Sequence, residues 1–458
     1  MKLTVIGGGG VRSLFLAKSI AQQAKKLQIT QLCFMDIDEE KLRIYGGMAR
    51  AATHRLCPEL TFSLTDDAVS AVTDADYIIT TIRVGGDYLR VRDERIALAH
   101  EVLGQETTGA AGVSFAMRSI PALANYCELI RKYSKPTVKV FNFTNPAGLV
   151  SQALRDMGYD FTFGICDAPS GMLRQIASYK NVSPECISGE CYGLNHLSFF
   201  RSIKIDGEEI LDDLIQDDGA YEHTDLRFFN KALVMEKKSV LNEYLYYYYY
   251  REKAVDHILH ASQTRGELIE EVNRHMTAEL KEIDVESDFD RALLCFEKWY
   301  GIRENAYMSN ETHIHRDRKW TFDLYSPDAG GYAGVALRFI EIAHSGKKQQ
   351  MILCVPNEGA IPGLRDKDVI ESSCDVTASS CVPHTVSKDQ IPPSNLELIR
   401  RVKYFERTAA KGIIERSLQD ITEALAMHPL VASYSIAADI ARQYIALNKD
   451  YISGWHDR

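Results

Sequence analysis

The sequence predicts an α/β protein, and three observations lead to that prediction. A β-branched run at residues 2–6 passes through four glycines, 7–10, into a helical pattern over residues 11–26. Apolar runs of strand type then alternate with helical stretches as far as residue 166. Beyond residue 171 a hairpin-like stretch gives way to mainly helical sequence. Together they predict an N-terminal Rossmann-type, doubly wound parallel sheet and a C-terminal α+β domain.

Five apolar runs are the expected strands of the N-terminal sheet. They are KLTVI (2–6), QLCFMDID (31–38), ADYIITTIRVGG (75–86), KPTVKVFNFTNPAG (135–148) and FTFGIC (161–166). Later, residues 349–385 are strand-like, and residues from 393 on have the spacing of amphipathic helices. A chain of 458 residues is too long for one core. We therefore expect an NAD-binding domain over residues 1–165 and a catalytic and oligomerisation domain over residues 166–458.

The composition favours a globular protein that acts on small molecules. A net charge of −10 argues against a nucleic-acid partner. No apolar run approaches the roughly 20 residues that span a bilayer. The N-terminus lacks a signal-peptide pattern, so we expect a cytoplasmic protein with no membrane partner. Ten cysteines without C-x-x-C pairs predict reduced, mostly buried thiols.

The glycine run between the first strand and helix predicts a dinucleotide site. Gly7 allows a tight turn, and Gly9 lets the backbone approach a pyrophosphate at the helix N-terminus. Asp36 follows the second strand at a distance suited to accept from a ribose hydroxyl, which favours NAD over NADP. The alternative is a glycine-rich turn that only packs the helix against the sheet. The expected cofactor-binding residues are Gly7, Gly9, Gly10, Val11, Arg12, Asp36 and Arg83.

Polar residues follow four of the expected strands. Binding sites in parallel sheets lie beyond the carboxyl ends of the strands. We therefore expect Asp36, Arg83, Asn145 and Cys166 to converge on one crevice.

Cys166 and His196 form a candidate metal site. Taken alone, each is more often a small or hydrogen-bonded core residue, and Asp167 is more often a helix cap. Together a thiolate and an imidazole suit a divalent transition metal whose other positions stay open for substrate.

Several motifs make the sequence resemble glycoside hydrolase family 4, the NAD- and metal-dependent glycosidases. They run in the family's order from residue 6 to 267: IGGGG, DIDEEK, IRVGG, LGQETTGAAG, NFTNPAG, ICDAP, YGLNHLSF, LNEYL and QTRGE. Near the C-terminus, VPNEGAI stands where the family commonly has N-N-G-A/S-I. The resemblance also implies a lactate/malate dehydrogenase-like fold and a homodimer or homotetramer.

The resemblance implies a role for each matching residue. Cys166 and His196 would hold a catalytic metal, usually Mn²⁺, and Tyr244 would be the base. The alternative for Tyr244 is a helix-packing ring beside Tyr247 and Tyr248. The acid would be Asp167, and the substrate-binding residues would be Arg90, Asn145, Asn195 and Arg265.

The family's reaction is hydrolysis through oxidation at C3, deprotonation at C2, elimination at C1, water addition and re-reduction. Residues that resemble phosphate contacts, Arg90 first, favour a sugar 6-phosphate. QETTG, FTNPAG and YGLNHLSF resemble the 6-phospho-β-glucosidase branch, whereas C-D-x-P at residues 166–169 resembles the phospho-α branch. We favour the β-glucoside, with a 6-phospho-α-glucosidase or a glycosidase for unphosphorylated sugars as alternatives.

Two other functions use the same nucleotide fold. A 2-hydroxyacid dehydrogenase would need an arginine–histidine–aspartate constellation and no metal cysteine. A non-catalytic sugar-phosphate or NAD sensor would have little use for Cys166, His196 and Tyr244 together.

Overall fold

The computed structural model describes residues 1–315, 320–327 and 332–457. The chain forms two compact units that alternate along the sequence. The first unit contains Met1–Gly104, Arg118–Thr144 and Glu252–Ile340, and the second contains Gln105–Met117, Asn145–Arg251 and Glu341–Arg458. Residues 252–340, which the sequence analysis put in the second domain, therefore pack with the first unit. The two units are defined by how the chain packs, whereas the predicted domains were defined by function. The NAD-binding and catalytic domains therefore stay predictions.

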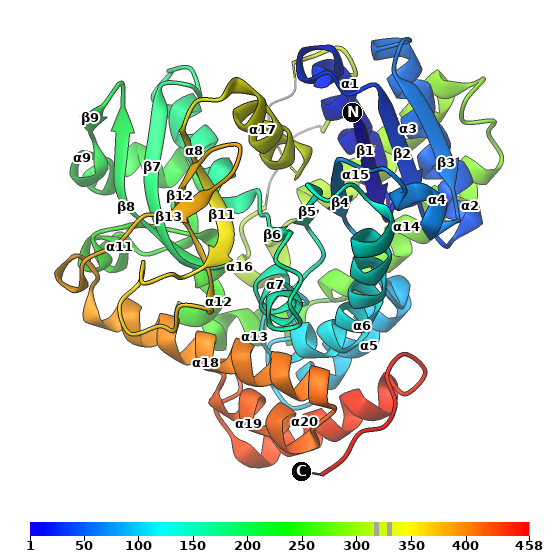
Figure 1. The fold of residues 1–458 in the computed structure, drawn as a ribbon. Coiled ribbons are helices and arrows are strands. Elements are labelled where there is room, and N and C mark those ends of the chain that lie inside the picture. The colour runs from blue at the N-terminus through cyan, green and yellow to red at the C-terminus, as the bar shows by residue number, and fades with distance from the viewer. Residues whose placement is uncertain (316–319, 328–331, 458) are drawn as a thin grey trace. The chain divides into compact units, whose positions relative to one another are not determined.

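The first unit is built on a parallel sheet, as the strand–helix alternation predicts. Its strands lie in the order β5-β4-β1-β2-β3, and each neighbouring pair is parallel. The strands are β1 (Lys2–Ile6), β2 (Gln31–Met35), β3 (Thr61–Thr65), β4 (Tyr77–Thr80) and β5 (Lys139–Asn142). Figure 1 shows β1, β2 and β3 in blue beside α1 and α3. β1, β2 and β4 are almost wholly buried, which explains their continuous apolar sequence.

The first unit contains helices as well as its sheet, and some of them share an apolar core around Leu14, Met48, Met276 and Phe296. The helices are α1 (Ser13–Leu27), α2 (Glu39–Lys41), α3 (Gly47–Leu56), α4 (Ala68–Val72), α5 (Gly86–Leu98), α13 (Arg251–His260), α14 (Arg265–Lys281), α15 (Phe289–Asn305) and α16 (Ser309–Thr312), with a π-helix at Leu42–Gly46. α6 (Gly109–Tyr133) and α17 (Tyr332–Ser345) each contribute residues to both units.

The second unit holds strands of two sheets. In one, the antiparallel strands β11 (Gln349–Pro356), β12 (Val369–Val376) and β13 (Cys381–Pro383) follow β6 (Thr162–Gly164) in the order β13-β12-β11-β6. The other holds a hairpin of β7 (Ile187–Leu194) and β8 (Leu197–Ile205), with β9 (Glu208–Glu209) and β10 (Val240–Leu241) paired to β8. The hairpin confirms the expectation for residues 189–207.

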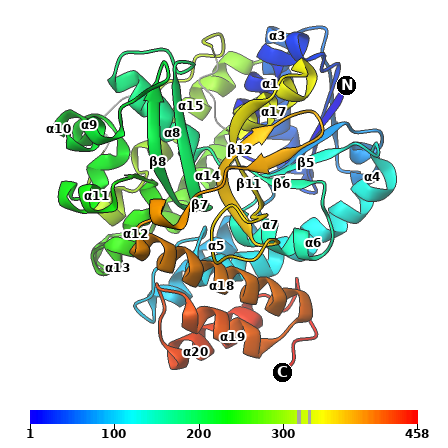
Figure 2. The same cartoon turned by 60° about the vertical axis from the view of Figure 1, so that its left-hand side comes forward.

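Helices complete the second unit. Figure 2 shows α18 (Pro393–Glu415), α19 (Leu418–Met427) and α20 (Tyr434–Leu447) in orange to red, and α19 packs on both of the others. The remaining helices are α7 (Ala147–Asp156), α8 (Ala168–Tyr179), α9 (Leu211–Gln216), α10 (Asp218–His223), α11 (Lys231–Lys237) and α12 (Tyr246–Tyr249), with 3-10 turns at Asp225–Phe228, Glu243–Leu245 and Lys388–Gln390. Among the described helices, none is both long enough and apolar enough for a membrane span.

Strand lengths differ from the sequence prediction at their carboxyl ends. β2 ends at Met35, β4 at Thr80, β5 at Asn142 and β6 at Gly164, so these four predicted runs are two to six residues too long, whereas β1 matches its predicted bounds. The extra residues form loops instead, although the first of them can still bond to a neighbouring strand. Phe143, for example, still donates its N–H to the carbonyl of Thr80, but the chain then turns at Asn145.

A buried ion pair fixes the loop that follows β4. Arg118 of α6 and Asp93 of α5 are 2.6 Å apart, and their side chains are 1% and 3% exposed. Arg118 also donates to the carbonyl of Val84, one residue after Arg83. Removing one partner of such a pair leaves an uncompensated buried charge.

We expect Asp93→Ala to lower the free energy of unfolding by about 3–5 kcal/mol. Glu128→Ala is the matched control, because it removes an exposed partner of Arg131 and should cost no more than about 1 kcal/mol. Urea unfolding of both variants measures the difference. Equal losses would contradict the role given to the buried pair.

Candidate active site

The glycine run after β1 is shaped by close packing against the sheet. Gly7 and Gly8 donate their N–H groups to the carbonyl of Met35, both at 2.8 Å. Gly7 has φ +100°, and a Cβ there would lie 2.4 Å from the carbonyl oxygen of Thr81. A Cβ on Gly8 would lie 2.6 Å from the Cβ of Phe34. Glycine is therefore required here by packing, which leaves the nucleotide role as a prediction.

Asp36 holds this loop from the end of β2. Its carboxylate accepts hydrogen bonds from the N–H of Gly9 at 2.9 Å and of Asp38 at 3.1 Å. Burial raises the pKa of Asp36, although both of these hydrogen bonds act in the opposite sense. Gly10, Val11 and Arg12 lead directly into α1, with Arg12 at its N-cap position. The loop, Asp36 and the start of α1 thus form one assembly, as a dinucleotide site requires.

Arginines gather elsewhere in the first unit. Arg90 on α5 is buried, and Arg265 on α14 donates to the carbonyl of Arg303 on α15 at 2.9 Å. Burial lowers the pKa of Arg303 to about 10, and Arg12, Arg265 and Arg90 add to the effect. The buried Nε of Arg303 makes no hydrogen bond within the described residues. This cluster of neighbouring arginine side chains is suited to bind an anion.

Glu94 lies among these arginines and ties α5 to α14. It accepts from the hydroxyl of Thr264 at 2.6 Å and from the N–H of Gly266 at 2.8 Å. Burial raises its pKa to about 7, although Arg90 lowers it. Arg83, by contrast, lies 3.9 Å from Asp87, its ion-pair partner one helical turn on. The sequence analysis missed Arg303, because it stands within an ordinary helical pattern that no motif marks.

Cys166 and His196 come together in the second unit. Cys166 lies two residues beyond β6, and His196 lies in the turn between β7 and β8 with φ +61°. The Sγ of Cys166 is 3.5 Å from the Nε2 of His196. Both side chains are buried. The prediction that these two residues share one site is supported by this geometry.

The burial of this pair keeps both groups uncharged. Burial raises the pKa of Cys166 well above its usual value, and the carboxylates of Glu371 and Asp167 raise it further. Burial lowers the pKa of His196 to about 4. A thiolate becomes favourable here only when a nearby cation compensates its charge.

The residues fit a divalent metal ion. For tetrahedral Zn²⁺ as a reference ion, bonds of about 2.3 Å to sulfur and about 2.0–2.1 Å to nitrogen separate the two ligand atoms by about 3.5 Å. The observed distance is also 3.5 Å. Within the described residues, no group of three or more His, Cys, Asp or Glu side chains could hold a metal ion. A metal ion held by Cys166 and His196 alone would have further coordination positions for oxygen ligands, as metal ions in open catalytic sites do.

Tyr244 stacks on the imidazole of His196. The ring centroids are 3.8 Å apart and the planes are inclined by 15°. Tyr244 lies on the 3-10 turn Glu243–Leu245 and not on the regular helix that the sequence analysis assumed. Tyr247 and Tyr248 use their hydroxyls elsewhere, with Gln105 and Thr108. The alternative of a simple helix-packing ring is therefore less suited to Tyr244 than a place beside the metal ligands.

Two carboxylates adjoin the pair. Asp167 is the N-cap residue of α8, yet its side chain makes no capping hydrogen bond, so the simple helix-cap interpretation does not hold. Glu371 on β12 accepts from Asn195 at 3.0 Å and from Ser198 at 2.8 Å. Burial raises the pKa of Glu371 to about 7, although these two bonds lower it. The sequence analysis missed Glu371. Glu371 is one of two acidic residues in the strand-like run 369–376, and a carboxylate inside such a run is the signal that could have found it.

The four residues expected to converge at the strand ends divide between the units. Asp36 and Arg83 belong to the first, whereas Asn145 and Cys166 belong to the second. Arg90 and Arg265 belong to the first unit, and Asn195 belongs to the second. The common crevice for Asp36, Arg83, Asn145 and Cys166 therefore stays a prediction.

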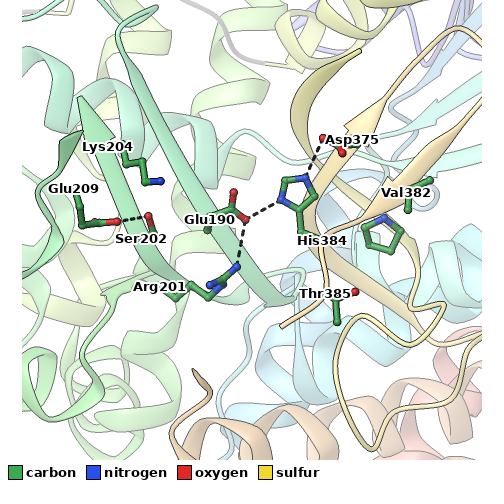
Figure 3. A pocket seen from close by; sticks show the side chains of 10 residues that line it. Glu190, Arg201, Ser202, Lys204, Glu209, Asp375, Val382, His384 and Thr385 are labelled. Carbon is green, nitrogen blue, oxygen red and sulfur yellow. Dashed lines mark hydrogen bonds and ion pairs between the residues drawn. The ribbon is translucent and has the colours of Figure 1, made fainter. Parts of the chain in front are cut away.

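A separate cavity of about 690 Å³ lies in the second unit, and none of the residues predicted from sequence lines it. Figure 3 shows His384 between Glu190 and Asp375, with Arg201 beside Glu190. The imidazole lies 2.8 Å from Glu190 and 3.1 Å from Asp375. Burial lowers the pKa of His384, but the two carboxylates more than offset this and raise it overall. The charged groups of this cavity thus largely pair with one another.

We expect His384→Gln to destabilise the protein more at pH 5.5 than at pH 8.5. A raised folded-state pKa means that the imidazolium stabilises fully below the unfolded value of about 6.5. That stability is lost as the pH rises through the folded-state pKa. Chemical unfolding at both pH values measures it, and a loss independent of pH would contradict the ion pairs.

Known proteins resemble this chain along nearly its whole length. Two family models match it, family 4 glycosyl hydrolase over residues 2–182 and the family 4 glycosyl hydrolase C-terminal domain over residues 191–431. A 6-phospho-beta-glucosidase of Thermotoga maritima is 27% identical over 99% of both chains. A 6-phospho-alpha-glucosidase of Lacticaseibacillus paracasei is 26% identical over 98% of this chain and 97% of its own.

Solved structures agree with the fold. The Thermotoga maritima 6-phospho-beta-glucosidase with manganese, NAD⁺ and glucose-6-phosphate has a TM-score of 0.81 and 26% identity, over 99% of this chain and 100% of its own. A malate dehydrogenase from Salinibacter ruber, at 14% identity and a TM-score of 0.51 over 91% of this chain and 99% of its own, shares the fold alone. The predicted Rossmann-type, lactate/malate dehydrogenase-like fold class is confirmed.

Proposed function

Because this chain belongs to family 4 of the glycosyl hydrolases, we propose that it hydrolyses 6-phosphoglucosides with NAD and a divalent metal such as Mn²⁺. The observation that carries the proposal is the buried contact of Cys166 with His196, on whose ring Tyr244 stacks. A thiol, an imidazole and a phenol meet there in the arrangement that this chemistry needs.

Each cofactor has residues suited to it. Cys166 and His196 would hold the metal through sulfur and nitrogen. Gly7, Gly9, Gly10, Val11 and Arg12 would face the pyrophosphate of NAD at the start of α1, with Asp36 on the ribose and Arg83 nearby. When bound, NAD supplies a reversible hydride acceptor for C3, and the metal ion supplies a positive charge beside the C3 oxygen.

The chain's own groups move the protons. Once C3 is a ketone, the C2 hydrogen is acidic and Tyr244 removes it as general base. Elimination then breaks the bond from C1 to the leaving oxygen, and Asp167 protonates that oxygen. Water adds at C1 and gives its proton to Asp167, and Tyr244 returns a proton to C2. Once the hydride is also back on C3, the sum of the steps is hydrolysis. Asn145 and Asn195 orient the sugar hydroxyls.

The arginines of the first unit support a phosphorylated substrate. Arg90 and Arg265 are the proposed phosphate contacts, and buried Arg303 adds to the positive field around them. A relative's structure contains glucose-6-phosphate, the product class that this reaction would release. A homodimer or homotetramer and a cytoplasmic location stay predictions.

The anomer divides the candidates. The stretches QETTG, FTNPAG and YGLNHLSF favour the 6-phospho-β-glucoside. The pair Cys166-Asp167 favours the second candidate, a 6-phospho-α-glucoside, and relatives of both kinds match the chain. C2 deprotonation does not depend on the configuration at C1, so the same residues serve either anomer. No specific observation favours a dehydrogenase, since the likeness to malate dehydrogenase is one of fold alone.

A panel of nitrophenyl α- and β-glucosides, each with and without the 6-phosphate, tests the proposal. We expect cleavage of the β-glucoside 6-phosphate only when NAD⁺ and Mn²⁺ are both present. In D₂O the product should carry deuterium at C2, because Tyr244 exchanges its proton with solvent. Mass spectrometry and NMR of the released sugar measure the label.

Tyr244→Phe should lower kcat at least about 100-fold and abolish the label. Tyr247→Phe is the matched control, because it removes the hydroxyl of a neighbouring tyrosine. The ring centroids of Tyr247 and Tyr244 lie 6.0 Å apart. This control variant should keep both activity and label. Hydrolysis without NAD⁺, or unlabelled product from the parent enzyme, would overturn the proposal.

A further inference from the structure

A continuous hydrogen-bonded chain links Asn195 to the turn that carries Tyr244. Asn195 Nδ2 donates to Glu371 Oε1 at 3.0 Å, and Ser198 Oγ donates to Glu371 Oε2 at 2.8 Å. Asn242 Nδ2 donates to Ser198 Oγ at 3.2 Å. The Oδ1 of Asn242 accepts from the N–H of Tyr244 at 3.0 Å. All of these residues belong to the second unit.

The direction of each bond in this chain is forced. Only the Oδ1 of Asn242 can accept from a backbone N–H, so its Nδ2 must donate to Ser198. Ser198 then has its hydroxyl hydrogen left for Glu371, and an ionised carboxylate accepts from both Ser198 and Asn195. While Glu371 is ionised, no member can reverse its role without leaving a neighbouring donor or acceptor unpaired.

The network is also buried, and its residues come from three segments of the chain. Glu371 lies on β12, Ser198 on β8, and Asn242 caps the 3-10 turn Glu243–Leu245. Their exposed fractions are 1%, 2% and 4%. Buried hydrogen bonds of this kind are stronger than exposed ones and costly to leave half made. The turn that carries Tyr244 is thereby tied to the strand next to His196.

We propose that Glu371, Ser198 and Asn242 are positioning residues that hold the ring of Tyr244 against His196 for proton transfer at C2. The chemical part of this inference rests on the proposed function. Near-attack geometry tolerates little displacement, so a small shift of the turn would slow the proton transfer strongly.

Ser198→Ala is the decisive variant, because it cuts the network in the middle and leaves every proposed catalytic residue in place. Ser373→Ala is the matched control. Ser373 is also buried, donates to the carbonyl of Gly189 at 3.0 Å and accepts from the N–H of Cys191 at 2.9 Å, and neither of these bonds leads to Tyr244. Ser198→Thr keeps a hydroxyl at this position and should therefore behave like the parent protein.

The first readout is hydrogen exchange of the segment 241–248 in the protein without substrate. Loss of a buried hydrogen bond should speed exchange of the Tyr244 amide roughly tenfold in Ser198→Ala. Ser373→Ala should leave this segment unchanged. Because this readout needs no turnover, it decides the positioning role even if the proposed hydrolysis fails.

The second readout is kinetic. Ser198→Ala should lower kcat roughly 10- to 100-fold and leave the substrate KM and the Kd of NAD within about twofold. The isotope effect on a substrate deuterated at C2 should rise, because proton transfer becomes more rate-limiting. Unchanged exchange and an unchanged isotope effect in Ser198→Ala, or equal changes in Ser373→Ala, would overturn the positioning role.

Discussion

The second unit depends on one constraint, the burial of a thiol against an imidazole where neither carries charge. Cys166 and His196 are brought together by a strand end and a hairpin turn that are 30 residues apart along the chain. Two nearby carboxylates, Asp167 and Glu371, oppose ionisation of the thiol. A protein that needed only a filled core would not surround a cysteine with carboxylates. The arrangement is understandable when a cation completes the charge balance.

The first unit contains groups that are suited to bind anions. Its glycine run is held by the carbonyl of Met35 and the carboxylate of Asp36 and leads into the start of α1, where the helix dipole favours negative charge. Its arginines depress one another's pKa values in a buried setting, a state that an oxyanion would relieve. In the proposed reaction one unit thus supplies sites for phosphates and the other supplies a site for a cation.

Most of the strand-and-helix order, the hairpin and the fold class could be predicted from sequence, because burial on both faces of a parallel sheet leaves long apolar runs. β3 was missed, because its sequence TFSLT alternates and none of its residues is fully buried. The carboxyl ends of β2, β4, β5 and β6 could not be predicted, because the strand-like pattern runs on into loops such as residues 143–146. The pairing of Cys166 with His196 came from motifs. Glu371 and Arg303 were missed because their roles arise from segments distant in sequence. Tyr244 was placed on a helix because a tyrosine run hides the cap at Asn242, which begins a 3-10 turn.

The most direct measurement of the central claim is anomalous X-ray scattering at the manganese edge, from crystals grown with Mn²⁺. The account predicts one strong peak within about 2.0–2.5 Å of both Cys166 Sγ and His196 Nε2, and its loss in Cys166→Ser with NAD binding retained. A strong manganese peak that touches neither side chain, or one that survives in Cys166→Ser, would contradict it.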